Sequence, residues 1–159
     1  MSDASSNNLS DRVARLADRV ARLEDEQAVI ATLYAYGTAL DYGNRSLFLD
    51  CFTPDADYVV EMRLSPEGSF RSCGYQELGA YFDSHTHAPD AYHKHVTINP
   101  TVTCNGDRAT ATSYFMRVDA APATGPATVL AFGRYVDTLV RDQTGRWRIV
   151  SRRCEVENL

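Results

Sequence analysis

The sequence of 159 residues lacks the long apolar run, roughly 18–20 residues, that a membrane-spanning helix requires. It also lacks an excess of positive charge. The net charge of −5 argues against a nucleic-acid partner, because binding to phosphates needs a basic face. Residues 1–8 are polar and contain no apolar segment of the kind that signal peptides carry. These absences predict a protein with no membrane partner, no nucleic-acid partner and no secretion signal.

Cysteine is present but never as a closely spaced pair. The four cysteines stand at positions 51, 73, 104 and 154, and no C-x-x-C motif occurs. In a chain of this size, such scattered cysteines are typical of reduced, mostly buried thiols in the cytosol. The sequence therefore predicts a cytoplasmic protein.

Motifs for cofactors are absent as well. The sequence has no Gly-rich phosphate loop, no G-x-S-x-G and no dinucleotide-binding fingerprint. Four histidines, His85, His87, His93 and His95, lie close together, but no carboxylate or cysteine completes a recognisable ligand spacing. We therefore expect chemistry without a cofactor and without a metal.

The chain has the length of one domain, and its hydrophobic periodicity changes along the sequence. Helical periodicity comes first, and strand alternation dominates after residue 92. Helices are predicted at 25–42, 45–52 and 74–84, and strands at 57–62, 93–104, 107–119, 127–141 and 145–157. This order predicts an α+β domain whose antiparallel sheet curves around helices and leaves a cavity between the layers.

A seven-residue repeat precedes this domain. DRVARLA at 11–17 is followed by DRVARLE at 18–24, which places Val13, Leu16, Val20 and Leu23 at heptad positions a and d. Two heptads are too few for a stable coiled coil alone. We expect an amphipathic lead-in helix at 10–24 that packs on its own domain or on a sister subunit. Residues 1–9 are predicted to be disordered, and 25–159 to form a single domain.

Asp41 is a carboxylate on the apolar face of a predicted helix. With about 3.6 residues per turn, Ile30, Leu33 and Gly37 lie on one face, and Asp41 follows one turn after Gly37. A carboxylate that faces a core is costly unless it has a partner. His95 is the partner that the sequence offers, so we predict a contact between Asp41 and His95.

Three segments carry a resemblance to a known fold family. They are LYAYGTALDYGNRSLFLDCFTPDADY at 33–58, HVTINPTV at 95–102 and GRWRIVSRR at 145–153. Residues 24–157 resemble the nuclear transport factor two-like superfamily, and within it the SnoaL-like branch. The resemblance implies a curved antiparallel sheet wrapped around N-terminal helices, with a cone-shaped cavity. It does not specify a reaction, since this fold hosts cyclases, dehydratases, isomerases, hydrolases and non-catalytic subunits.

The resemblance also implies a role for Asp41 and His95. In the similar scytalone dehydratases, bile-acid dehydratases and hexachlorocyclohexane dehydrochlorinases, an aspartate and a histidine at these positions form a dyad. The histidine removes a proton from carbon, and the aspartate orients the imidazole. An imidazole carries protons well near neutral pH, and a carboxylate on one ring nitrogen stabilises its charged form. The alternative is a buried Asp–His pair without a substrate.

Tyrosines are the next candidates for the site. Tyr36 lies five residues before Asp41, the spacing of a tyrosine near the dyad in the similar bile-acid dehydratases. Tyr34 lies on the Asp41 face by helical geometry. Either phenol is predicted to hydrogen-bond a substrate oxygen or an enolate, and each is alternatively a core residue. Tyr58 lies on the first predicted strand, where the similar dehydratases line their pocket with aromatic side chains.

Three polar residues complete the predicted substrate-binding set. Asn99 follows His95 by four residues, as in the similar dehydrochlorinases, and it precedes Pro100, which predicts a bulge. Arg117 and Asp119 form an R-x-D whose side chains share one strand face. The similar limonene epoxide hydrolases carry R-x-D here as part of a water-activating set. The alternative for this pair is a structural ion pair.

Epoxide hydrolysis also needs an acid on the last strand. There the sequence has Arg152 and Arg153, with Glu155 as the available substitute acid. Strand alternation places Arg153 on the same face as Trp147 and Ile149, so Arg153 is the arginine expected to enter the cavity.

These observations predict a cofactor-independent lyase or isomerase, a dehydratase or cyclase. Its substrate would be cyclic and mostly apolar, such as a polyketide, steroid or terpenoid. The alternative is a non-catalytic subunit similar to the β subunits of ring-hydroxylating dioxygenases, or a small-molecule binding module, and the third is an epoxide hydrolase. We expect a homo-oligomer, dimer or trimer, because the outer face of an open curved sheet needs cover.

Overall fold

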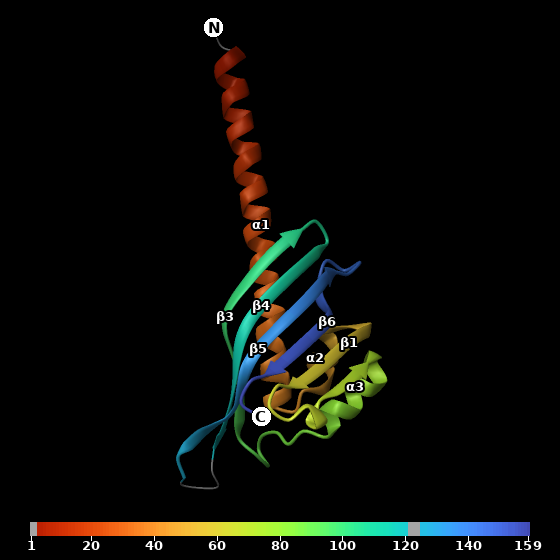
Figure 1. Cartoon of the computed structure of the whole chain (residues 1–159). Helices are drawn as coiled ribbons and strands as arrows, with labels where there is room; N and C mark the ends of the chain where they lie inside the picture. The colour runs from red at the N-terminus through yellow and green to blue at the C-terminus, as the bar shows by residue number, and fades with distance from the viewer. Residues whose placement is uncertain (1–2, 121–124) are drawn as a thin grey trace.

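The structure is a computed structural model that describes the backbone of residues 3–120 and 125–159 and the side chains of residues 8–120 and 125–159. Helices come first in the chain and most of the strands follow (Figure 1). The elements are α1 (Asp3–Asp41), α2 (Arg45–Asp50), β1 (Phe52–Met62), a 3-10 helix (Pro66–Gly68), β2 (Phe70–Cys73), α3 (Gly74–Asp83), β3 (His93–Asn105), β4 (Arg108–Ala120), β5 (Ala127–Arg141) and β6 (Trp147–Val156).

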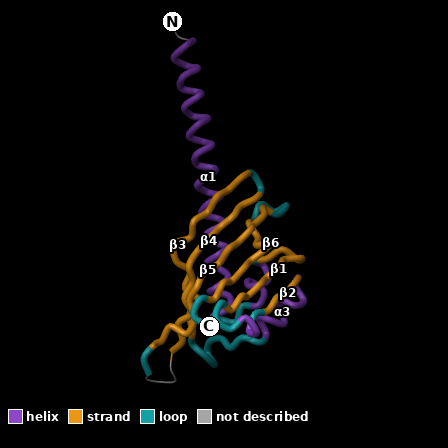
Figure 2. Tube along the Cα trace, viewed as in Figure 1, coloured by secondary structure: helices purple, strands orange, loops and turns teal. Residues whose placement is uncertain are grey.

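The strands form one curved, six-stranded sheet in the order β2-β1-β6-β5-β4-β3. β1 and β6 pair in parallel, and the other neighbouring strands pair in antiparallel fashion. In the view of Figure 2, α1 passes behind the sheet, where it packs along β3 and also touches β6 and α2. The predicted α+β class with a curved sheet and N-terminal helices is confirmed.

α1 is one uninterrupted helix, where the sequence predicted separate helices at 10–24 and 25–42. Glu24, Asp25 and Glu26 at the expected boundary are compatible with a helix interior, so no residue there ends the helix. The backbone is helical from Asp3, within the segment 1–9 that was predicted to be disordered, and residues 1–2 lie outside the described residues. Among the described helices, none is both long and apolar enough to cross a membrane.

Two further elements differ from the sequence prediction. β1 begins at Phe52 rather than at Asp57, and its pairing with β6 is irregular between these two residues, which obscures the alternation. β2 was not predicted, because four residues at a sheet edge are too short to show a period. The turns at Gly106 and Gly145 form as expected, with positive φ at both glycines. The turn predicted at 120–126 falls on residues that include 121–124, which lie outside the described residues.

The core lies between the helices and the inner face of the sheet. Leu33, Tyr36 and Leu40 of α1 are buried against Phe48 of α2 and Phe52 of β1. Tyr36 packs on both phenylalanines, with ring centroids 5.6 and 5.9 Å apart. Burying a side chain of this size stabilises a fold by about 1.5–3 kcal/mol, so these contacts hold α1 in place.

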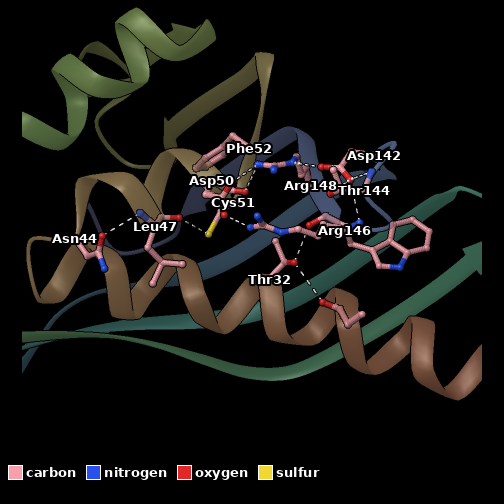
Figure 3. A network of polar contacts seen from close by, with 12 residues as sticks. Thr32, Asn44, Leu47, Asp50, Cys51, Phe52, Asp142, Thr144, Arg146 and Arg148 are labelled. Atoms are coloured by element: carbon pink, nitrogen blue, oxygen red, sulfur yellow. Dashed lines mark hydrogen bonds and ion pairs between the residues drawn. The ribbon is translucent and has the colours of Figure 1, made fainter.

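Polar contacts also hold α1 and α2 against the start of β6 (Figure 3). The Thr32 hydroxyl donates to the carbonyl of Trp147 over 2.8 Å. Arg148 donates from Nη1 to the backbone carbonyl and to Oδ1 of Asp50, both over 2.7 Å. Hydrogen bonds from Arg148 and then from Thr144 lower the pKa of Asp142 well below its usual range. The network fixes the helix that ends at Asp41.

Candidate active site

The end of α1 and the start of β3 bring Asp41 and His95 together. His95 Nδ1 lies 2.6 Å from Asp41 Oδ1, and the His95 backbone N–H donates to Oδ1 and Oδ2 over 3.2 and 3.1 Å. The two side chains are only 4% and 9% exposed. The contact expected from the helical position of Asp41 is therefore present, and the carboxylate is held by both the ring and the backbone of His95.

The local sequence explains this close approach. Gly37 lies one turn before Asp41, and a Cβ at Gly37 would stand 2.8 Å from the carbonyl oxygen of His95. A side chain at this position would push β3 away from α1. The helix then ends at Asp41, and Gly43 has a φ of 68°, which favours glycine. Gly37 thus allows the contact between the strand and the helix, and Gly43 turns the chain after it.

A cavity of about 220 Å³ lies beside His95. Its walls come from α1, α3 and the inner face of the sheet, and most of the side chains are aromatic or aliphatic. The polar groups that it contains are phenols, imidazoles, one guanidinium and a thiol, and no carboxylate lines it among the described residues. Such a cavity suits an apolar molecule with few polar groups.

Three phenols and one imidazole form a chain of hydrogen bonds along this cavity. Tyr36 Oη lies 3.1 Å from Tyr58 Oη, which lies 3.3 Å from Tyr81 Oη. Tyr81 Oη in turn lies 3.4 Å from His85 Nε2. Burial raises the pKa of Tyr58 and of Tyr81 well above the usual value, so both phenols keep their protons near neutral pH. They are available as hydrogen-bond donors to an oxygen in the cavity.

His85 and Tyr81 were not predicted as site residues. Their four-residue spacing places them on one side of the last turn of α3 and the residues after it, a signal that was available in the sequence. The His85 ring lies 6.1 Å from the His95 ring between centroids. Burial lowers the pKa of His85 to about 4. The hydrogen bond that His85 Nδ1 donates to the backbone carbonyl of Tyr81 opposes this shift, and the charges of His95 and Arg117 add to it. His85 is therefore neutral near pH 7.

Acidification is expected to destabilise the protein through His85. The ordinary pKa of 6.5 becomes about 4 in the folded state, so the unfolded state binds more protons between these values. The free energy of unfolding therefore falls as pH decreases through this window, on the order of 2 kcal/mol for this group. Urea unfolding at about pH 7 and about pH 5 measures the loss, which His85→Gln should reduce. Equal losses in both proteins would contradict this assignment.

His93 lies next to Asp41 and His95 and forms a compact group with them. It is 3% exposed, and its Nε2 lies 3.6 Å from Asp41 Oδ1 with no hydrogen-bond partner in the described part of the chain. Burial, followed by the charge of His95, lowers its pKa. Ligand atoms of Asp41, His93 and His95 lie within 4.8 Å of one another, a set that a transition metal can use. This possible set of metal ligands could not be recognised from the spacing of residues in the sequence, because Asp41 lies 54 residues before His95.

Only some of the other predicted site residues line the cavity. Tyr36 and Tyr58 line the cavity, as does Arg117. Tyr34 is 49% exposed and does not line the cavity. Asp119 also lies outside the cavity lining and binds Arg117 in a two-point ion pair, with N···O distances of 2.9 and 3.0 Å.

Asn99 lies at a strand irregularity rather than at the cavity. The pairing of β3 with β4 shifts between Ile98 and Thr101, and Asn99 has a φ of 51°. The bulge predicted from the neighbouring proline is confirmed. The side chain is exposed and lines a different surface hollow.

The acid suggested for epoxide hydrolysis lies elsewhere. Glu155 is 4% exposed and does not line the cavity. It pairs with Arg63 over 2.8 Å and with Arg134. Its carboxylate is thus bound to two guanidinium groups, and hydrogen bonds from Arg134 lower its pKa.

Comparison with known families now identifies the domain. Residues 21–153 match the SnoaL-like domain. The chain belongs to this family. A search of curated protein sequences gives no match.

Solved structures similar to this SnoaL-like chain share its fold. An NTF2-like protein with a cystatin-like fold from Novosphingobium aromaticivorans has a TM-score of 0.78 and 24% identity, over 91% of this chain and 90% of that one. A protein from the same organism assigned as a scytalone dehydratase has a TM-score of 0.69 and 16% identity, over 85% of each chain. Another, assigned as the β subunit of an aromatic-ring-hydroxylating dioxygenase, has a TM-score of 0.70 and 20% identity, over 88% and 93%. At these identities the likeness shows the fold alone.

Proposed function

We propose that this SnoaL-like protein is a cofactor-independent acid–base enzyme, a dehydratase, cyclase or isomerase of a cyclic, mostly apolar substrate. The observation that carries the proposal is the 2.6 Å contact between Asp41 and His95 beside an apolar cavity. A buried carboxylate on one ring nitrogen fixes the orientation and the tautomer of the imidazole, and the surrounding apolar walls exclude water. We further propose that the protein works in the cytoplasm as a homo-oligomer.

His95 is the proposed proton acceptor. Its Nδ1 is engaged by Asp41, which leaves Nε2 to accept a proton from a carbon next to a carbonyl. Asp41 stabilises the imidazolium that forms. Tyr58 and Tyr81, which keep their protons, donate hydrogen bonds to the oxygen that gains negative charge. Return of the proton from His95 to a departing hydroxyl gives water and an alkene, whereas its return to another carbon gives an isomer.

The size of the cavity restricts the substrate. About 220 Å³ is small beside the roughly 300–1,000 Å³ of typical ligand pockets. This favours a compact substrate of one or two rings over a full steroid. Arg117 and His85 at the wall supply polar contacts for one or two oxygens on such a ring.

Proton exchange tests the proposal without knowledge of the natural substrate. We expect the protein to catalyse exchange of hydrogen for deuterium at the carbon next to the carbonyl of small cyclic ketones in D₂O, followed by NMR. The exchange should be faster for one- and two-ring ketones than for open-chain ketones of equal size. Rates equal to those of buffer across the whole panel would contradict acid–base catalysis.

Removal of metal ions is expected to leave this exchange unchanged. The short Asp41–His95 contact uses Nδ1 and Oδ1 for each other, and the proposed reaction needs both in that state. The measurement is the exchange rate before and after dialysis against EDTA. A loss of activity that added zinc restores would instead assign Asp41, His93 and His95 to a metal centre.

A non-catalytic subunit is the second candidate, favoured by the likeness to the dioxygenase β subunit. In that case the protein should co-purify with a larger iron–sulfur protein from its native cells and show no exchange activity. The third candidate, epoxide hydrolysis, would incorporate oxygen from labelled water into a diol. Co-purification and the incorporation of labelled oxygen therefore distinguish these two candidates from the proposed dehydratase or cyclase.

A further inference from the structure

The first half of α1 carries an exposed apolar stripe. From residue 8 to residue 24 every described side chain of the helix is exposed, and the segment projects beyond the sheet (Figure 1). Its large apolar side chains follow one another at intervals of four and three residues. They are Leu9, Val13, Leu16, Val20 and Leu23, with exposed fractions of 62, 57, 56, 52 and 59%. Five such residues in a row at this spacing form a continuous seam.

The protein's own domain does not cover the seam. All five side chains are more than half exposed, and they lie on the part of α1 that projects beyond the sheet (Figure 1). The repeat therefore does not pack on its own domain, and the remaining alternative is a sister subunit.

We propose that a second copy of this chain covers the seam, and that the two α1 helices form a parallel, two-stranded coiled coil. The branched Val13 and Val20 occupy positions a, and Leu9, Leu16 and Leu23 occupy positions d. Branched residues at a with leucine at d favour two parallel strands. This inference goes beyond the proposed function, because the seam does not touch the cavity beside His95.

The charges next to the seam support the parallel orientation. Arg19 is at position g and Glu24 at position e, and both are exposed. In a parallel pair, Arg19 faces the partner's Glu24, and the symmetry of the dimer makes this contact twice. In an antiparallel pair aligned on the same seam, Arg19 faces Arg19 of the partner subunit, which is repulsive. The pairing of Arg19 with Glu24 therefore favours the parallel orientation.

The seam is short, but it lies on a helix whose later residues are fixed in the core. An isolated helix of this length is marginal because its first turn is costly to form. Here residues 29–40 of the same helix are fixed in the core, so the projecting segment only extends a helix that already exists.

The association state tests the proposal. Sedimentation of the full-length chain is expected to show a dimer, and Leu16→Glu should weaken it by at least about 100-fold, since two charges would enter the seam. The matched control is Ala21→Glu, which adds the same charge at an exposed position outside the seam. A monomeric wild-type chain, or an oligomer that Leu16→Glu leaves intact, would overturn the proposal.

A charge reversal and a cross-link test the parallel orientation. Arg19→Glu should weaken the dimer about fivefold by placing like charges together, and Arg19→Glu combined with Glu24→Arg should restore it. In a Cys73→Ser background, Val13→Cys should form a disulfide between the two copies, because equivalent a positions meet in a parallel pair. A dimer that is unchanged by Arg19→Glu and does not cross-link through Val13→Cys would show the antiparallel arrangement and overturn this orientation.

Discussion

Replacing His95 by Gln is expected to lower the rate of catalysed proton exchange by about 10³-fold, within the range of about 10²–10⁴ that a positioned base contributes. Gln fills a similar space and can still donate to Asp41, but it has no nitrogen that accepts a proton from carbon. The cavity beside this position should therefore persist while the proton acceptor is lost. The measurement is the deuterium exchange rate of the best ketone, with the thermal midpoint as a check on folding.

The Asp41→Asn variant tests whether Asp41 positions the His95 imidazole or takes part directly in the proton transfer. Asp41 touches the ring of His95 and does not line the cavity, so it acts through the imidazole. We expect a loss of about 10²-fold in rate. We also expect the KM for the ketone to stay close to that of the wild type, because Asp41 does not line the cavity. A misfolded variant would lose its affinity for the ketone together with its rate.

His87→Gln is the matched control for both variants. His87 comes from the same stretch of sequence, but its ring stacks on Phe82 at 6.3 Å and does not line the cavity. Its exchange rate should stay close to that of the wild type. If His95→Gln retained the exchange activity, or if His87→Gln lost it to the same degree, the assignment of His95 as the base would be wrong.

The need of Asp41 for a buried partner was predictable because it follows from one local rule. Helical periodicity fixes which face Asp41 occupies, and the cost of burying a carboxylate requires a partner. The same rule did not settle Tyr34. Periodicity places Tyr34 on the Asp41 face, yet it is 49% exposed, and which part of a helix face is covered depends on tertiary packing that no local pattern encodes.

The last strand shows where alternation fails. Trp147 and Ile149 are buried as expected, and continued alternation would bury Arg153. The pairing of β5 with β6 shifts between Thr138 and Leu139, which adds one residue to β6 at that point. A bulge of this kind reverses the faces of all later residues. Arg152 is consequently 0% exposed, and Arg153 points to solvent. The bulge depends on the partner strand, so the sequence of β6 alone could not predict it.

Arg152 therefore forms a buried ion pair under the cavity. Its Nε and Nη2 donate to Asp137 Oδ1 and Oδ2 over 2.8 and 2.9 Å. The guanidinium carbon lies 4.2 Å from the ring centroids of Tyr36 and Tyr135, both of which line the cavity. Burial opposes the charge of Arg152, but the ion pair with Asp137 outweighs it and raises the pKa of Arg152 above its usual value. The charged pair is thus part of the floor on which two cavity tyrosines rest.

Asp137→Ala is expected to lower the free energy of unfolding by about 3–5 kcal/mol, because it leaves a buried guanidinium without its counter-charge. The double variant Arg152→Met with Asp137→Ala removes both charges and should lose no more than about 2 kcal/mol, since apolar groups can replace a buried ion pair. Urea unfolding of both variants at one fixed protein concentration measures the difference. A double variant less stable than Asp137→Ala would contradict this account. The ion pair also bears on the cavity, because Asp137 holds the guanidinium on which Tyr36 and Tyr135 stack.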